Sequence, residues 1–264
     1  MNTLVKSGKF GLLAIVLLSF LTGLFGCTTP QVQQPQQNTF MPPPTHPIQE
    51  PVRAPLRHDV CHIVAPLETV WRISKMYNVS VDSIIRTNNL NQNGDINKGQ
   101  KLIIEDAAPW KPVIPLYKTN KWRYIIIHHS ATDYGSALQF DKAHLKRGFW
   151  NGLGYHFVID NGTANKEDGQ IEVSPRWIKQ QNGAHCKANN MNRKGIGVCV
   201  VGDYTDKKLS DRQMESLIYL VKKLRSYYGI PEKNIMGHGQ VPGARTECPG
   251  KNFPWKEFWR RLDA

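Results

Sequence analysis

Histidines at the ends of two apolar runs, together with one cysteine, are placed where two imidazoles and a thiolate could hold a metal ion. His128 and His129 end the mostly apolar run 122–127, His238 ends a second apolar run, 235–237, and Cys248 follows in a Thr-Glu-Cys-Pro-Gly segment. Two imidazoles and one thiolate give Zn²⁺ three ligands and leave a fourth position open, as in catalytic zinc sites. This spacing also arises by chance, so the prediction depends on the elements that position the three residues.

The two runs that end in histidine predict buried strands. A continuous apolar run bounded by polar residues is typical of a strand covered on both faces, and functional groups often follow strand ends. We expect helices over 140–150 and 210–228; in the second, Ser210 and Gln213 form a capping box, and Gly229 ends the helix. These elements predict an α/β fold with a mixed central β-sheet flanked by helices.

Five motifs follow one another in an order known from a protein family. They are IIHHSAT (126–132), GYHFVID (154–160), GAH (183–185), GIGVCVVG (195–202) and the segment 237–250, which begins Gly-His and ends Cys-Pro-Gly. Residues 122–259 thereby resemble the type 2 N-acetylmuramoyl-L-alanine amidases, which include peptidoglycan recognition proteins and phage amidase-type lysozymes. The resemblance implies a zinc enzyme that hydrolyses the amide between N-acetylmuramic acid and the L-alanine of the stem peptide.

The resemblance also implies a role for particular residues. The zinc ligands fall on His128, His238 and Cys248, with Zn²⁺ as the cofactor. His129 follows the first ligand, and because adjacent strand residues face opposite ways, we expect it behind the ligands or in packing. Cys199 occupies the position where some members carry a glutamate general base.

Two hydroxyl groups are the predicted catalytic donors. The phage-type branch has a tyrosine that is present here as Tyr155, and Thr246 stands where several members have a lysine. A core position for the Tyr155 ring is the alternative, and the donor would then be Thr246 or His185. His185, Asn190 and Arg245 are predicted to contact substrate, the last two through the carboxylates of the peptide.

Residues 59–106 predict a small second domain. Strands are expected at 62–64 and 99–104, with helices at 68–77 and 79–88 between them. The segment resembles the LysM module in His-Ile-Val (62–64), 68–74, 77–79, Asn88, Leu90, Ile96 and 99–102, although Leu67 stands where the family usually has glycine. We expect Trp71 to be a core aromatic residue of this βααβ fold.

The LysM resemblance implies that this domain binds glycan containing N-acetylglucosamine. The groove would lie between two loops, formed by Pro66, Leu67, Glu68 and Thr69 on one side and by Asn91, Gly94, Asp95 and Ile96 on the other. Simple turn formation is the alternative role for these loop residues. No catalytic constellation is visible in this segment.

The amino terminus predicts export. Lys6 and Lys9 precede the uncharged apolar run 10–25, which suits a signal peptide and is short for a membrane span. The run ends in Leu-Phe-Gly before Cys27 and resembles a lipoprotein signal, so we expect residues 1–26 to be removed and Cys27 to carry lipid. An ordinary signal peptide with a chance cysteine is the alternative.

The remaining segments organise the chain around these domains. A Pro/Gln-rich linker, 27–58, would be an extended tether, a second linker spans 107–118, and the catalytic domain spans 119–264. We therefore expect an exported protein of the bacterial cell envelope that is anchored by lipid, with the outer membrane or periplasm favoured over the inner membrane.

Charge and cysteine usage leave two questions open. The net charge of +13 suits acidic partners such as peptidoglycan or anionic lipid, but the scattered Lys and Arg do not predict nucleic-acid binding. With Cys27 and Cys248 assigned, two of Cys61, Cys186 and Cys199 could pair in an exported chain. The rival function is a non-catalytic peptidoglycan-binding lipoprotein; the presence of Cys248 favours the enzyme, and a purely structural wall anchor leaves the triad unexplained.

Overall fold

The computed structural model describes residues 56–264, which belong to one compact unit. The predicted signal peptide, the lipid-bearing Cys27 and nearly all of the first linker lie outside the described residues. None of the helices in the described part of the chain is long and apolar enough to cross a membrane.

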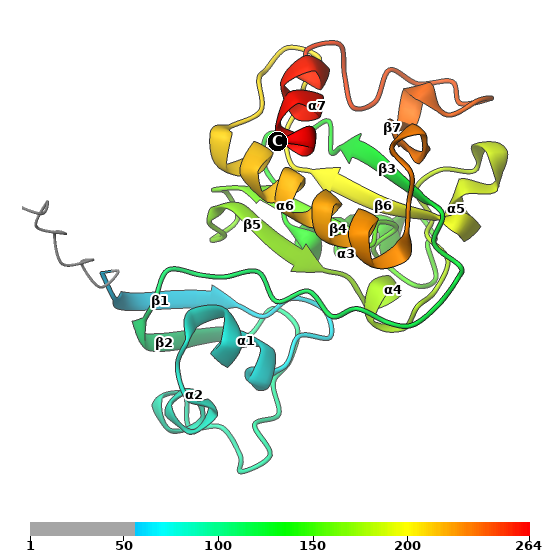
Figure 1. The fold of residues 1–264 in the computed structure, drawn as a ribbon. Helices are drawn as coiled ribbons and strands as arrows, with labels where there is room; N and C mark the ends of the chain where they lie inside the picture. The colour runs from blue at the N-terminus through cyan, green and yellow to red at the C-terminus, as the bar shows by residue number, and fades with distance from the viewer. Residues whose placement is uncertain (1–55) are drawn as a thin grey trace, which may run out of the picture. The chain divides into compact units, whose positions relative to one another are not determined.

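The N-terminal module (residues 58–107) has the predicted βααβ order. It consists of β1 (His58–Ile63), α1 (Val70–Tyr77), α2 (Val81–Thr87) and β2 (Lys101–Ala107), and the two strands pair antiparallel (Figure 1). Each helix begins at a side-chain cap: Thr69 accepts from the Arg72 amide and Ser80 accepts from the Ser83 amide. Val64, Ile73, Tyr77, Leu102 and Ile104 belong to its core.

The prediction that Trp71 belongs to this core is wrong, because its side chain is 58% exposed. Val70, Ile73 and Tyr77 form the buried stripe of α1, and Trp71 lies about 100° around the helix from Val70. On that outer face the Lys75 ammonium group lies 5.9 Å from the centre of the Trp71 ring.

The large domain (residues 124–263) is built on a five-stranded mixed sheet. Its strands are β3 (Tyr124–His129), β4 (Phe157–Asn161), β5 (Asp168–Val173), β6 (Gly195–Val200) and β7 (Ile235–Gly237), in the spatial order β5-β4-β6-β3-β7. Four strands run parallel, and β5 pairs antiparallel with β4. The predicted mixed sheet is therefore confirmed.

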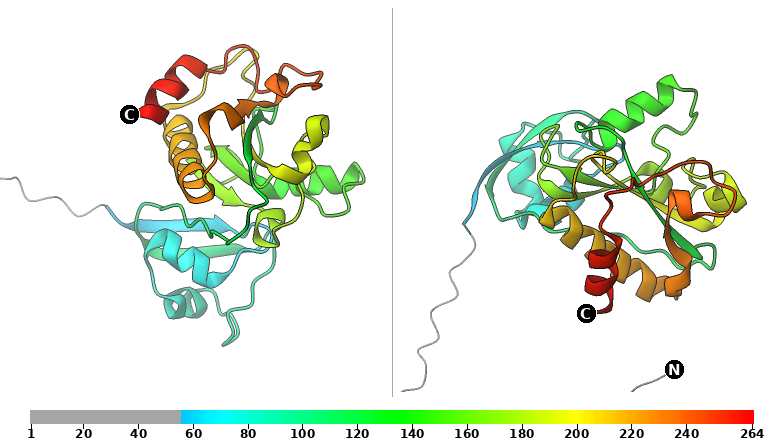
Figure 2. Two further views of the ribbon diagram at one scale, coloured as in Figure 1. Left: turned by 45° about the vertical axis from the view of Figure 1, so that its right-hand side comes forward. Right: turned by 90° about the horizontal axis from the view of Figure 1, so that it is seen from above.

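Helices cover both faces of this sheet (Figure 2). The longest, α6 (Asp211–Tyr228), packs Met214, Leu217 and Val221 into the main core on one face, and α3 (Ala137–Lys146) packs Phe140 against Val158 on the other. The remaining α-helices are α4 (Pro175–Ile178), α5 (Met191–Lys194) and α7 (Trp255–Asp263), and short 3₁₀ helices span Ala188–Asn190, Glu232–Asn234 and His238–Gln240.

The sequence predicted α6 more accurately than α3. The Ser210–Gln213 capping box is present, and Gly229 ends α6 with a left-handed φ of 61°. In contrast, the helix expected over 140–150 begins at Ala137 and ends at Lys146. It stops earlier because Gly148 adopts a φ of 81°, which no continuing helix allows.

Buried ionic contacts join the N-terminal module to the large domain. The Lys166 ammonium group is buried; it lies 2.9 Å from the Glu172 carboxylate and donates to the Ile63 carbonyl at 2.8 Å. Nearby, the His62 imidazole lies 2.8 Å from the Glu68 carboxylate. The segment between the two parts is also packed, since the Lys111 amide donates to the Met76 carbonyl and the Trp177 indole donates to that of Pro115.

All four cysteines of the described residues, Cys61, Cys186, Cys199 and Cys248, are free thiols. The disulfide that an exported chain could form among the first three is therefore not present. Cys186 and Cys199 are buried, whereas Cys61 is exposed on β1. Burial in separate places explains why no pair of these thiols meets: Cys199 packs with α3, and Cys186 packs in a cluster that includes Val241.

The buried Glu68 carboxylate predicts a pH-dependent stability. Burial alone raises its pKa, but the charge and hydrogen bond of His62, with Lys166 and Arg72, outweigh burial and lower that pKa from 4.5 to about 2. Between these values the folded state binds fewer protons than the unfolded state, so stability falls as the pH decreases from about 4.5 to 2.

Glu68→Gln removes this titration. We expect the variant to be less stable than the wild type by about 2 kcal/mol at pH 7, the scale of hydrogen bonds to a charged group. The difference should shrink markedly at pH 3. Urea unfolding at the two pH values measures it, and a difference that stays constant would contradict the assignment of the Glu68 pKa.

Candidate metal centre

The sheet brings the three predicted ligands together at one edge. Ile127 of β3 pairs with Gly237 of β7, so the next residues, His128 and His238, emerge side by side at the carboxyl ends of two parallel strands. Their ring centres are 4.7 Å apart. One donor atom from each of His128, His238 and Cys248 lies within 4.8 Å of the other two.

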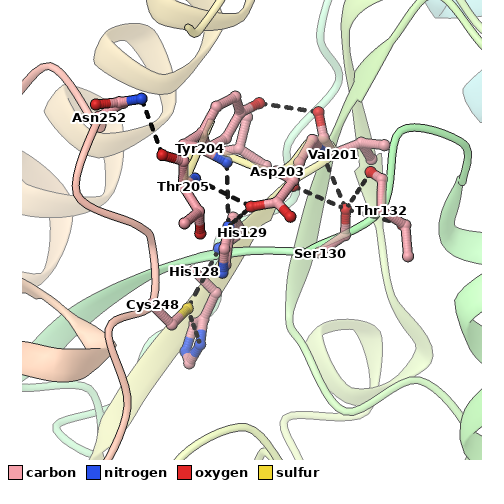
Figure 3. Close-up of polar contacts among 12 residues, drawn as sticks. His128, His129, Ser130, Thr132, Val201, Asp203, Tyr204, Thr205, Cys248 and Asn252 are labelled. Atoms are coloured by element: carbon pink, nitrogen blue, oxygen red, sulfur yellow. Dashed lines mark hydrogen bonds and ion pairs between the residues drawn. The ribbon is translucent and has the colours of Figure 1, made fainter. Parts of the chain in front are cut away.

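Backbone contacts fix the position of the cysteine. The Cys248 sulfur lies 3.7 Å from His128 Nδ1 and accepts from the His129 amide at 3.4 Å (Figure 3). The Cys248 carbonyl accepts from the Gly239 amide at 2.7 Å, and the Cys248 amide donates to the Thr246 hydroxyl oxygen at 3.2 Å. The loop that carries the third ligand is thus tied to the turn that carries the second.

A chain of hydrogen bonds orients the first ligand. His185 Nε2 lies 3.2 Å from the Gly195 carbonyl, which can only accept, so this nitrogen carries a proton. Burial lowers the pKa of His185 to about 3, so its ring is neutral and its Nδ1 accepts from His128 Nε2 at 3.0 Å. His128 therefore keeps an unprotonated Nδ1, which faces Cys248. Partners of this kind fix the tautomer of histidines that bind metals.

The chemistry of the three donors fits zinc. Burial lowers the pKa of His128 well below its usual value and also lowers that of His238, so both imidazoles offer a lone pair at neutral pH. Burial raises the pKa of the Cys248 thiol to about 12, so its thiolate forms near neutral pH only beside a cation. A His-His-Cys set with this geometry is a typical zinc site with an open fourth position.

His129 is separate from this set, as the alternation along β3 predicts. Its Nδ1 accepts from the Tyr204 amide at 3.3 Å and lies 3.6 Å from the Asp203 carboxylate (Figure 3). Its side chain therefore supports the loop after β6.

Tyr155 lies beside the first ligand. Its half-buried ring is centred 5.2 Å from the His128 ring, and burial raises the pKa of its phenol well above the usual value, so the hydroxyl stays protonated. Its ring packs against a buried cluster that includes Cys199 and Phe140. Tyr155 also lines a cavity of about 240 Å³.

Two residues of this cavity were missed by the sequence analysis. Arg147 lines it, and His144 does so while its Nδ1 accepts from the Gly154 amide at 2.9 Å, which fixes the backbone next to Tyr155. Both residues fall in the predicted helix 140–150. In the sequence, a polar residue that lines a site on a helix looks the same as one that faces solvent.

The other predicted contacts of the large domain lie in three different places. Thr246 and Arg245 are exposed in the loop that carries Cys248. His185 is buried behind His128 rather than open to a ligand. Asn190 is exposed and lines a cavity with Arg123 and Lys194, at the amino ends of β3 and β6, whereas the triad lies at the carboxyl end of β3.

Most of the predicted glycan-binding residues share one cavity of about 530 Å³. Its lining includes Pro66, Leu67, Glu68, Thr69 and Ile96. Asn91, Gly94 and Asp95 of the second predicted loop are not part of it, and the Asn91 amide donates instead to the Asp95 carboxylate. The Glu68 Oε2 atom accepts from the Ala65 amide and contacts His62, so this oxygen is occupied within the module.

The bond between His185 and His128 predicts an effect on zinc affinity. His185→Phe keeps a ring between Gly183 and Gly197 but leaves the His128 Nε2 proton without an acceptor. We expect zinc affinity to fall roughly 10- to 100-fold, the usual effect of removing such a partner. Competition with a chromophoric chelator measures this, with the exposed His58→Phe as the control; wild-type affinity in a folded His185→Phe protein would contradict the role.

Comparison with known proteins agrees with this site. A model of the N-acetylmuramoyl-L-alanine amidase family matches residues 118–251, and a LysM domain model matches residues 62–105. Peptidoglycan-recognition protein SC2 of Drosophila melanogaster is 33% identical over 148 residues, which cover 53% of this chain and 73% of that protein. The endolysin of Escherichia phage T7 is 33% identical over 146 residues, which cover 52% of this chain and 85% of the endolysin.

This chain is also similar in sequence to an amidase of known structure. The N-acetylmuramoyl-L-alanine amidase LysC from Clostridium intestinale URNW is 30% identical, with a TM-score of 0.45, and the match covers 58% of this chain and 95% of that one. The family model and the curated relatives match the segment that carries the triad. This chain therefore belongs to the N-acetylmuramoyl-L-alanine amidase family and carries a LysM domain before its amidase domain.

Proposed function

We propose that this protein is a zinc-dependent hydrolase that cuts the amide between N-acetylmuramic acid and the L-alanine of the stem peptide, in turnover or remodelling of the bacterial cell wall. The observation that carries the proposal is the His128, His238 and Cys248 triad, with the Tyr155 ring centred 5.2 Å from the His128 ring. The same observation counts against a non-catalytic binding protein, since binding alone requires no such triad.

Zinc bound to the triad would polarise the scissile carbonyl and lower the pKa of water to about 7. Around that position the chain offers neutral donors. Burial raises the pKa of the Tyr155 phenol, so its hydroxyl is protonated and can donate one hydrogen bond. We expect it to donate to the negative charge that develops on the carbonyl oxygen of the substrate.

Cys199 does not replace a glutamate as a general base. It is fully buried, and burial raises the pKa of its thiol well above the usual value, so it stays protonated. The exposed hydroxyl group of Thr246 lies two residues from Cys248 and is the second donor to the oxyanion in this proposal. The exposed Arg245 beside it is placed to meet a carboxylate of the stem peptide.

The two domains indicate on which side of the membrane the protein acts, and the amino-terminal sequence suggests how it is held there. Domains that bind and cut peptidoglycan imply an extracytoplasmic position. We further propose that Cys27 carries lipid, so that the Pro/Gln-rich segment holds the enzyme at a distance from the membrane.

The chemistry can be tested with Tyr155→Phe. The change removes one polar atom and keeps the ring, so zinc content and fold should be preserved and stability should change by no more than about 1 kcal/mol. On soluble N-acetylmuramoyl peptides, kcat should fall roughly 10²- to 10³-fold, the usual effect of losing one oxyanion donor. KM should change little, because the bond forms chiefly in the transition state.

Mass spectrometry of the products tests the reaction itself. The wild type should release peptides with a free amino-terminal alanine and leave intact sugars with a free lactyl carboxyl group. Cleavage within the glycan or within the peptide would refute the proposed reaction. Near-normal kcat in zinc-loaded Tyr155→Phe would instead leave the reaction standing and assign the Tyr155 ring to packing.

A further inference from the structure

The cavity of about 530 Å³ is lined by both the N-terminal module and the large domain. One wall carries the predicted glycan-binding loops of the module, including Leu67 and Asn97. The opposite wall comes from the large domain and includes Trp150 and Asn151, which follow α3, and Gln181, which follows α4. The large domain therefore extends the surface that the LysM loops offer.

The walls of this cavity are held together by ionic contacts. Lys98 of the module lies 3.1 Å from the Asp141 carboxylate on α3, and the same carboxylate accepts from the Leu153 amide at 3.0 Å. The buried Lys166 joins the Ile63 carbonyl to Glu172 nearby. Because one carboxylate holds both the module and the segment after α3, the cavity is formed before any ligand enters.

The lining combines exposed apolar surface with neutral amides. Leu67 is 49% exposed and Trp150 is 95% exposed, an unusual position for a tryptophan. The side chains of Asn97, Asn151 and Gln181 add donors and acceptors. An aromatic face beside a few convergent amides is the chemistry that receives N-acetylated sugars, whose rings have apolar faces and whose hydroxyl and acetamido groups are polar.

One short segment of chain joins the cavity to Tyr155, whose ring lies beside that of His128. Tyr155 lies four positions after Asn151, so their Cα atoms are at most about 15 Å apart, at 3.8 Å per residue. His144 and Asp141, on the same helix, fix the backbone of this segment through the Gly154 and Leu153 amides. The cavity and Tyr155 are therefore joined by one short stretch of chain that α3 holds in place.

We propose that this cavity binds the glycan strand itself, so that one N-acetylated chain contacts the LysM loops and Trp150 of the amidase domain together. The inference rests on the proposed function. It adds a glycan subsite that the LysM loops and the amidase domain form together. The strand would present its stem peptide to the metal site from a fixed distance.

Charge favours the glycan over the stem peptide as the occupant. Lys98 is neutralised by Asp141, and the Glu68 carboxylate is taken up by His62. Lys179 is the cation of the lining for which the described residues show no acidic partner within 4 Å. Because the sugars of a peptide-bearing strand are uncharged, a lining of amides and apolar groups suits them better than it suits a peptide with several carboxylates.

Calorimetry with peptide-free oligomers of N-acetylglucosamine tests the proposal on the full mature chain. Such oligomers contain no scissile amide, so binding is measured apart from hydrolysis. We expect one oligomer per protein, with binding weakened roughly tenfold by Trp150→Ala and by Leu67→Asn. Asparagine tolerates the left-handed φ of 60° at position 67, so this change removes the apolar surface without strain.

Trp71→Ala is the matched control, since it removes an exposed tryptophan of the module that is not part of the cavity. It should bind oligomers as the wild type does. Wild-type binding by folded Trp150→Ala, or two oligomers per protein, would overturn the shared subsite. If the wild-type protein binds oligomers but hydrolyses no amide, the proposed function is refuted and the glycan subsite remains supported.

Discussion

The parallel pairing of β3 with β7 is the constraint on which the candidate metal site depends. Because Ile127 lies opposite Gly237, His128 and His238 leave the sheet together, although they are far apart in the sequence. A shift of one residue along β3 would turn His128 to the other face and bring His129 forward. The register is fixed because Ile125 and Ile127 are fully buried in the main core, so any slip would move apolar side chains out of it.

A neutral hydrogen-bonded chain behind the site depends on the same strands. His185 reaches His128 only because Gly183 and Gly197 have no side chains: a Cβ atom at either position would lie within 2.3 Å and 2.5 Å, respectively, of the His185 ring. The glycines of the motifs GAH and GIG thus make room for a histidine that keeps His128 Nδ1 free for metal. The orientation of His128 therefore depends on the space that Gly183 and Gly197 leave for His185.

Features carried by local pattern were predictable from the residues themselves. The grouping of His128, His238 and Cys248 came from the family resemblance, and other features that need two distant segments were not predicted. The Ser210 capping box and the strands that end in His128 and His238 follow from residues close in sequence. The exposure of Trp71 was missed because the pattern marks an apolar stripe without showing where its edge falls. The position of His185 behind His128 and the cavity that joins Leu67 to Trp150 depend on tertiary packing, which no single segment encodes.

X-ray absorption at the zinc edge tests most directly whether these strands and the Cys248 loop build a metal centre. For protein loaded with one zinc, the account predicts one sulfur at about 2.3 Å and two imidazole nitrogens at about 2.0–2.1 Å, with a light atom as the fourth ligand. In Cys248→Ser the sulfur signal should be gone. A zinc shell without sulfur in the wild type, or with more than one sulfur, would contradict the account.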